Sequence, residues 1–87
     1  MKVILVYDVN QKRVGKVLNT CRKYLNWIQN SVFEGEITRA KLEKLKLELK
    51  EIINEQEDSV VIFILKREWT VSKEILGVTK SFQDAFI

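Results

Sequence analysis

Few side chains in this sequence could do chemistry, and Asp8 has the most informative position among them. It follows a run of apolar residues, Val3 to Tyr7. Catalytic residues of open sheets often lie just past the end of a buried strand, and Mg²⁺ is commonly held by one or two carboxylates together with phosphate oxygens and water. Asp8 is therefore a candidate metal ligand, and two copies meeting across a dimer axis would make a better site than one. The alternative is that Asp8 or Asn10 caps the helix that follows.

The composition excludes several other kinds of site. Histidine is absent, and Cys21 is the only cysteine. A zinc site and the usual nucleophile–histidine triads are therefore excluded, and any hydrolysis must use carboxylates, Tyr, Lys, Ser or a hard metal ion that activates water. A single cysteine forms no internal disulfide, so we expect Cys21 to fill the core in a reducing cytosol.

The basic residues are concentrated in one stretch of the chain. No acidic residue occurs between Asp8 and Glu34, and that interval holds five basic ones: Lys12, Arg13, Lys16, Arg22 and Lys23. The net charge is +3, so the rest of the chain carries −2, which is +3 minus +5. A basic helix face is expected where a phosphate backbone binds, although an ordinary solvated helix surface can have the same composition. No helix-turn-helix or single-strand-binding aromatic motif is evident, so phosphate contact rather than base contact is expected.

The elements that must position these residues alternate between strand and helix. We predict strands at 2–9 and 60–65, and a helix at about 12–27 whose apolar stripe is Val14, Val17, Leu18, Cys21, Leu25 and Ile28. Residues 28–37 are strand-like, either one strand kinked at Gly35 or two short ones. Thr38 is a fair N-cap for a second helix at about 39–55, and a short strand is predicted at 74–78.

This order is typical of the ferredoxin-like fold, a split βαβ arrangement with both helices on one face of the sheet. We predict one α/β (α+β) domain, βαββαβ with an extra C-terminal edge strand, over residues 1–78, followed by a tail over residues 79–87. The strands at 3–7 and 60–65 are apolar at consecutive positions and therefore require burial on both faces. A second sheet packed face to face would bury the uncovered face, so the sequence predicts a homodimer. The C-terminal strand could cover an edge of its own sheet or of the partner's.

Several motifs together resemble one known family. They are Tyr7-Asp8 after the first strand, a basic helix with Arg13 and Lys16, the stretch QNSVFEGEIT at 29–38, and the strand that begins Asp58-Ser59-Val60. These residues resemble the second core family of CRISPR-associated proteins, the Cas-two proteins, over residues 1–78. The specific part of the resemblance is Gln-x-Ser-Val-Phe-Glu-Gly.

The resemblance implies a ferredoxin-like homodimer that acts in spacer acquisition, where it bridges CRISPR integrase subunits and holds the duplex DNA to be inserted. It also implies that some members are Mg²⁺-dependent endonucleases acting on single-stranded RNA or duplex DNA, with the aspartate at the Asp8 position of each subunit holding the metal. The candidate catalytic residues are Asp8, Tyr7, Arg13, Ser31 and Phe33. The candidate nucleic-acid-binding residues are Lys12, Arg13, Lys16, Arg22 and Lys23.

Three functions are compatible with these observations. The first is an adaptation subunit that is chiefly a DNA-binding scaffold, with optional nuclease activity. The second is a stand-alone Mg²⁺-dependent endoribonuclease resembling the toxin-type interferases that share this fold. The third is an interaction module with a partner-docking tail that includes Trp69, Phe82 and Phe86. No stretch approaches the ~20 apolar residues of a membrane span, so we expect a soluble, cytoplasmic protein with no membrane partner.

Overall fold

The computed structural model describes residues 1–67 and 70–79 of the 87-residue chain. The elements follow one another as β1 (Lys2–Asp8), α1 (Gln11–Arg22), β2 (Asn26–Gln29), β3 (Val32–Glu36), α2 (Arg39–Ile52), β4 (Ser59–Leu65) and β5 (Val71–Gly77). Trp69 and the predicted tail from residue 80 onward, with Phe82 and Phe86, lie outside the described residues, so the docking-tail hypothesis stays a prediction. None of the helices in the described ranges is long and apolar enough to cross a membrane.

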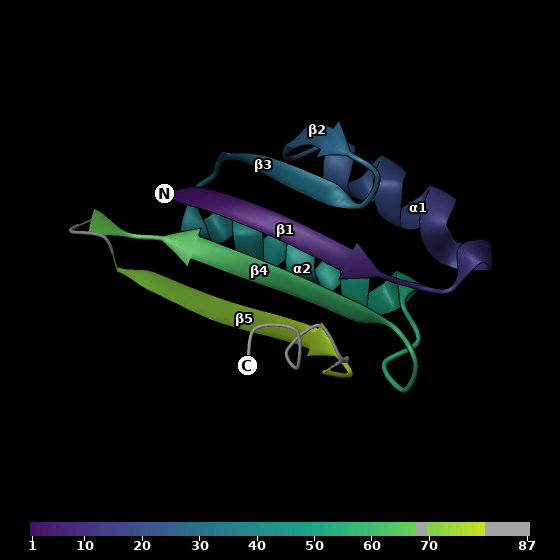
Figure 1. Cartoon of the computed structure of the whole chain (residues 1–87). Coiled ribbons are helices and arrows are strands. Elements are labelled where there is room, and N and C mark those ends of the chain that lie inside the picture. The colour runs from purple at the N-terminus through teal and green to yellow at the C-terminus, as the bar shows by residue number, and fades with distance from the viewer. Residues whose placement is uncertain (68–69, 80–87) are drawn as a thin grey trace.

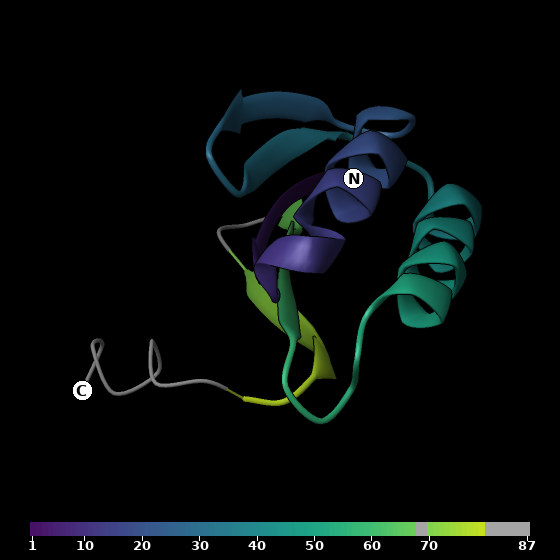
Figure 2. The same ribbon diagram turned by 90° about the vertical axis from the view of Figure 1, so that its right-hand side faces the viewer.

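The strands of the described residues form one five-stranded sheet in the order β2-β3-β1-β4-β5, and every neighbouring pair is antiparallel. Figure 1 looks onto the face of this sheet that carries no helix, with α2 visible behind β1 and β4. The turned view in Figure 2 shows both helices on the same side of the sheet. This arrangement confirms the predicted ferredoxin-like fold with an extra C-terminal strand. That strand, β5, extends the edge of its own sheet beside β4.

The two faces of the sheet differ in burial because successive side chains of a strand point to opposite faces. In β1, Val3, Leu5 and Tyr7 are buried, whereas Ile4 and Val6 are only half-buried. The covered face packs against the apolar stripes of the helices, which include Val17, Cys21, Leu42, Leu45 and Leu49. Within the described residues, the predicted need for burial on both faces is met on the face that the helices cover. On the other face Val61 is buried and Val71 is exposed, and the half-buried apolar side chains include Ile4, Val6, Val32, Phe63 and Leu65. Lys2, Glu34 and Lys73 share this face.

The first helix is shorter than the sequence pattern predicts. The apolar stripe predicts a helix to Trp27, but α1 ends at Arg22, and residues 26–29 form β2. Leu25 continues the helical spacing because its backbone N–H still bonds to the Cys21 carbonyl at 2.9 Å. Beyond it, the ladder with β3 pairs Trp27 with Phe33, so strand pairing overrides the helical periodicity. Ile28, assigned to the helix stripe, is consequently exposed on the edge strand.

The other boundaries differ from the predictions by a few residues, and two open questions are answered. Residues 28–37 belong to two strands, joined by a turn at Asn30 and Ser31. Asn10 caps α1, with its side chain accepting a hydrogen bond from the Lys12 backbone N–H at 3.0 Å. Thr38 caps α2 as predicted. The strand predicted at 74–78 is longer and runs from Val71 to Gly77, whereas α2 stops at Ile52 rather than near residue 55.

Candidate functional site

One end of the sheet brings together segments that are far apart in sequence. The end of β1 pairs with the start of β4 through Asp8 and Ser59, and Ser59 in turn pairs with Gly77 at the end of β5. The β2–β3 turn joins this end because the Tyr7 backbone N–H donates to the Ser31 carbonyl at 3.1 Å. Figure 1 shows the tip of β1, the β2–β3 turn, the start of α1 and the loop before β4 gathered on its right-hand side. Most of the sequence-predicted site residues lie here.

Asp8 is exposed at this end of the sheet. By strand alternation it lies on the same face as Ile4 and Val6, the face that no helix covers. It lines two hollows. One, of about 320 Å³, is also lined by Tyr7, Val9, Val14, Asn30 and Ser31. The other, of about 360 Å³, is also lined by Val9, Asn10, Glu57 and Asp58.

Arg13 is held by a second carboxylate that was not among the predicted site residues, Asp58. Asp58 is fully buried, and its Oδ2 and Oδ1 accept from Arg13 Nε at 2.5 Å and from a terminal guanidinium nitrogen at 3.0 Å. The same guanidinium also pairs with Glu57. Two backbone N–H groups complete the set, from Asn10 at 2.8 Å and from Asn54 at 2.9 Å. Asp58 therefore ties the loop after β1, the first turn of α1 and the loop before β4 into one unit, which we call the Asp58 pin.

The charge state of the Asp58 pin follows from these contacts. Burial on its own raises the pKa of the Asp58 carboxyl, but the hydrogen bond from Arg13 and those from the Asn54 and Asn10 backbones outweigh it and lower that pKa to about 2. The same hydrogen bonds, first to Asp58 and then to Glu57, raise the pKa of Arg13 above its usual range. The pair is thus ionised at neutral pH. With its oxygens already accepting these hydrogen bonds, Asp58 is poorly suited to bind a ligand.

Tyr7 and Phe33 are parts of the core. Phe33 is fully buried and Tyr7 nearly so, and their rings stack with centroids 6.3 Å apart. Burial, followed by the proximity of Cys21, raises the pKa of the Tyr7 hydroxyl. Burial also raises the pKa of the Cys21 thiol to about 12, so this cysteine is a neutral core residue, as predicted. The stacked pair is part of the core and supports the strand end that carries Asp8.

The predicted basic residues of α1 are not equivalent. Lys12, Lys16 and Arg22 are exposed. Lys23 pairs with Glu48 of α2 and lies 5.9 Å from the centre of the Tyr24 ring. Arg13 is only partly exposed and is engaged in the Asp58 pin. The side chains best placed to meet a phosphate backbone are therefore those of Lys12, Lys16 and Arg22.

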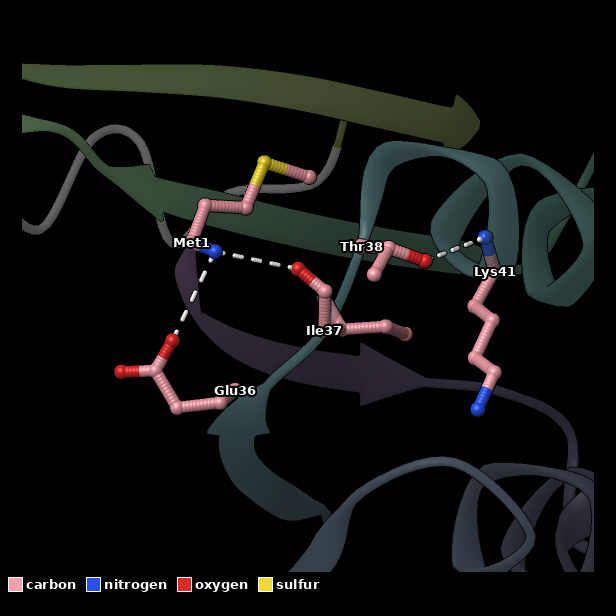
Figure 3. A pocket seen from close by; sticks show the side chains of 5 residues that line it. All are labelled: Met1, Glu36, Ile37, Thr38 and Lys41. Atoms are coloured by element: carbon pink, nitrogen blue, oxygen red, sulfur yellow. Dashed lines mark hydrogen bonds and ion pairs between the residues drawn. The ribbon is translucent and has the colours of Figure 1, made fainter.

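A further hollow, of about 310 Å³, lies at the opposite end of β1 (Figure 3). Its walls are Met1, Glu36, Ile37, Thr38 and Lys41. The amino group of Met1 donates to the Ile37 carbonyl at 3.1 Å and lies 3.5 Å from the Glu36 carboxylate. These contacts fix the start of β1 to the segment before α2. They bring no candidate catalytic residue into this hollow.

Two features of the site were missed from the sequence. Asp58 was considered as the start of a strand in the family resemblance, and the one local signal of its role was its position as an acid directly before the apolar run from Ser59 to Leu65. Trp27 was assigned to a helix, but it lies on β2, where its indole N–H donates to the Asn30 carbonyl at 2.9 Å. No sequence signal indicated that contact, because it depends on the turn that follows β2.

Comparison with known proteins shows the family of the chain. The sequence model of the family described as "CRISPR associated protein Cas2" matches residues 1–73. Proteins named "CRISPR-associated endoribonuclease Cas2" are 56% identical in Dictyoglomus turgidum, over all of both chains, and 53% identical in Thermotoga maritima, over all of this chain and 99% of that one. A solved Streptococcus pyogenes Cas2 structure superposes with a TM-score of 0.71 and 37% identity, covering 79% of this chain and 90% of that one. This chain belongs to the CRISPR associated protein Cas2 family.

Proposed function

We propose that this chain acts in CRISPR adaptation as a homodimer that binds duplex DNA and bridges integrase subunits, and that its Asp8 supports metal-dependent cleavage of phosphodiester bonds. The observation that carries the proposal is the position of Asp8 on the uncovered, apolar face of the sheet. The names of the relatives support a nuclease, since they are called endoribonucleases. Each part of the proposal has its own physical argument.

The uncovered face of the sheet supports the homodimer. Its apolar side chains form cross-strand pairs, Ile4 with Phe63 and Leu65 with Val71 among them, and Val71 is 56% exposed. A contiguous exposed apolar patch commonly marks an interaction site. A twofold axis would bury this face against the same face of a second copy. Because Asp8 shares the face, the Asp8 side chains of both copies would then border a single interface.

The side-chain oxygens at this end of the sheet could bind Mg²⁺ only in a site with few protein ligands. Within residues 1–67 and 70–79, no group of three acidic side chains could hold a metal ion alone. Asp58 is committed to Arg13, which leaves Asp8 as the carboxylate that would bind the ion, with the second copy's Asp8 as a further ligand. Mg²⁺ tolerates such a site because it keeps water and takes phosphate oxygens as ligands. When bound, it would activate water and offset the phosphate charge.

The exposed cations of α1 support binding to a phosphate backbone. Lys12, Lys16 and Arg22 lie on this one helix, and a dimer would present two such helices. Neutralising phosphates with Lys and Arg releases counterions, so binding should weaken steeply as salt rises. Duplex binding by this route needs neither Asp8 nor a metal ion.

A cleavage assay separates the catalytic part of the proposal from the scaffold part. Single-stranded RNA, single-stranded DNA and duplex DNA are each incubated with Mg²⁺ or EDTA and with wild type, Asp8→Asn or Glu51→Gln. The last variant is a matched control that removes an exposed carboxylate from α2. We expect Mg²⁺-dependent cutting by wild type and Glu51→Gln, and none by Asp8→Asn. Equal cutting by all three proteins would exclude Asp8, and no cutting by any would leave a DNA-binding scaffold.

The dimer has a separate test. Phe63→Glu places a charge in the middle of the uncovered face, whereas the control Lys50→Glu changes an exposed residue of α2, on the other side of the sheet. We expect sedimentation velocity to show a dimer for wild type and a monomer for Phe63→Glu. A Phe63→Glu variant that is folded and still dimeric would show that another surface forms the interface.

A stand-alone endoribonuclease is the second candidate function, and the names of the relatives favour it. It predicts cutting of single-stranded RNA alone, with weak duplex binding. The adaptation subunit predicts salt-sensitive duplex binding that is the same in wild type and Asp8→Asn. The two functions are therefore distinguished by a duplex-binding titration with the Asp8→Asn protein.

A further inference from the structure

Trp27 presents an unusually large exposed aromatic surface at the edge of the sheet. It lies on β2, the outermost strand, and its side chain is 50% exposed. Leaving half of an indole in water forgoes hydrophobic stabilisation that burial would give. The fold described above does not require this exposure, since Phe33, its partner across the ladder, is fully buried.

The ring of Trp27 is held in place. Its only hydrogen-bond donor, the indole N–H, donates to the Asn30 carbonyl at 2.9 Å. The Asn30 backbone has a φ of 42°, in the left-handed region that asparagine tolerates better than most residues. The polar edge of the indole is thus satisfied within the chain, and what remains exposed is aromatic surface. A restrained, exposed aromatic ring can bind a flat partner at little cost in side-chain entropy.

The ring is anchored to one wall of the Asp8 hollow. Asn30 and Ser31, the two residues of the β2–β3 turn, line that hollow together with Asp8. Trp27 pairs with Phe33 and so belongs to the helix side of the sheet, whereas Asp8 lies on the other face, and the turn of Asn30 and Ser31 separates the two at the end of the sheet. A nucleic-acid strand with one base on Trp27 would pass this turn to bring its backbone to Asp8. Nucleotides have this combination of a flat base and an adjacent phosphate, and each of the four bases has an aromatic face.

We propose that Trp27 is a stacking platform for an unpaired base of single-stranded nucleic acid whose backbone passes Asp8. The inference rests on the proposed function, and it names the preferred substrate class at that site. A base in a duplex is already stacked on both sides, so the platform discriminates in favour of single strands. Phosphate contacts by α1 are common to both forms and do not discriminate.

The test uses protein that binds but does not cut. In an Asp8→Asn, Trp69→Phe background, Trp27 is the only tryptophan. It is titrated with a 12-nucleotide adenosine-rich RNA, with the same RNA as a duplex, and with a strand of equal length and charge that lacks bases. We expect the single strand to quench tryptophan fluorescence, and the abasic strand and the duplex to leave it nearly unchanged.

The matched variants are Trp27→Ala and Ile28→Ala, which truncate neighbouring exposed residues of the same strand. Far-ultraviolet circular dichroism and sedimentation confirm that both are folded and have the wild-type oligomeric state. We expect Trp27→Ala to raise the Kd for the single strand about 10- to 100-fold, with the salt dependence unchanged, because stacking and not a phosphate contact is lost. Duplex affinity should not change, and Ile28→Ala should bind as the parent does.

Either of two binding results would overturn the inference: equal quenching by the abasic strand, or a single-strand Kd that is the same with and without Trp27. Altered sedimentation of a folded Trp27→Ala protein would also overturn it, because the ring would then belong to a protein interface. The proposed function fails separately. If cleavage by the otherwise wild-type protein is absent or independent of Asp8 while base-dependent quenching persists, only the catalytic proposal is lost.

Discussion

Two aspartates at the same end of the sheet have opposite environments. Asp58 is fully buried and accepts four hydrogen bonds, two from the Arg13 guanidinium and two from backbone N–H groups. Asp8 is exposed and borders hollows on two sides. The loop that contains Val9 and Asn10 connects the two regions.

This contrast separates a structural carboxylate from a candidate catalytic one. A buried charge is tolerated only when it is paired and hydrogen-bonded, and Asp58 meets that condition with groups of its own chain. Asp8 is exposed, on the face of the sheet where the proposed function places a second copy and a substrate. The Asp58 pin fixes the loop after Asp8, so the buried carboxylate positions the exposed one.

The largest expected effect is the difference in unfolding free energy between the Asp58→Ala and Asp8→Ala variants. Asp58→Ala leaves the Arg13 charge and two backbone donors without their partner, and we expect it to cost about 3–5 kcal/mol of unfolding free energy. Asp8→Ala removes an exposed side chain and should change stability by no more than about 0.5 kcal/mol. Urea unfolding followed by circular dichroism measures both values. A large loss with Asp8→Ala would mean that Asp8 is structural, and the contrast would disappear.

Much of the fold could be predicted from the sequence because its signals are local and repeated. The consecutive apolar residues of β1 and β4 indicated strands buried on a shared core, and the stripe of Leu42, Leu45 and Leu49 indicated a helix after the cap at Thr38. The order of the predicted strands and helices then indicated the ferredoxin-like arrangement. The position of Asp8 at the end of β1 followed from the same pattern.

The end of α1 and the Asp58 pin could not be predicted, because both depend on contacts between residues that are distant in sequence. The end of α1 was misplaced because Leu25 and Ile28 continue the helical spacing, while the competing ladder with β3 involves residues further along the chain. The Asp58 pin joins Arg13 to a residue 45 positions away, and no local pattern encodes that pair. Arg13 was therefore assigned to nucleic-acid binding on its charge and to the catalytic residues on the family resemblance, in both cases without knowledge of its partner.

The pH dependence of stability should report the buried aspartate specifically. The folded-state pKa of Asp58 is about 2, below the value of about 3.9 for an unperturbed aspartate. A group with a lowered pKa stabilises the fold fully above its unfolded pKa and loses that contribution as the pH falls toward the folded value. We expect the urea midpoints of wild type and Asp58→Asn to differ most at pH 6 and to converge between pH 4 and pH 2. Because the glutamates of α2 and β5 titrate in both proteins, a constant difference would show that Asp58 is not the group responsible.

A smaller effect on stability is expected from changing the geometry of the pin while keeping the charge of Arg13. Arg13→Lys retains the cation but loses the two-pronged contact with Asp58, and we expect a loss of about 1–2 kcal/mol by urea unfolding. Glu57→Gln removes the exposed partner of the same guanidinium and should cost about 0.5 kcal/mol or less.

Duplex binding by a variant without the cation decides what Arg13 does. Loss of one phosphate contact lowers the magnitude of the slope of log K against the logarithm of salt concentration by about 1. Because lysine keeps the cation, the test uses Arg13→Gln, checked for folding by circular dichroism. We expect no such change in its slope, because the wild-type guanidinium is occupied by Asp58 and Glu57. Lys16→Gln, which removes an exposed cation one turn further along α1, serves as the positive control. Unchanged stability of Arg13→Gln together with a reduced slope would place Arg13 on the nucleic acid rather than in the pin, and Asp58 would then need another partner to remain buried.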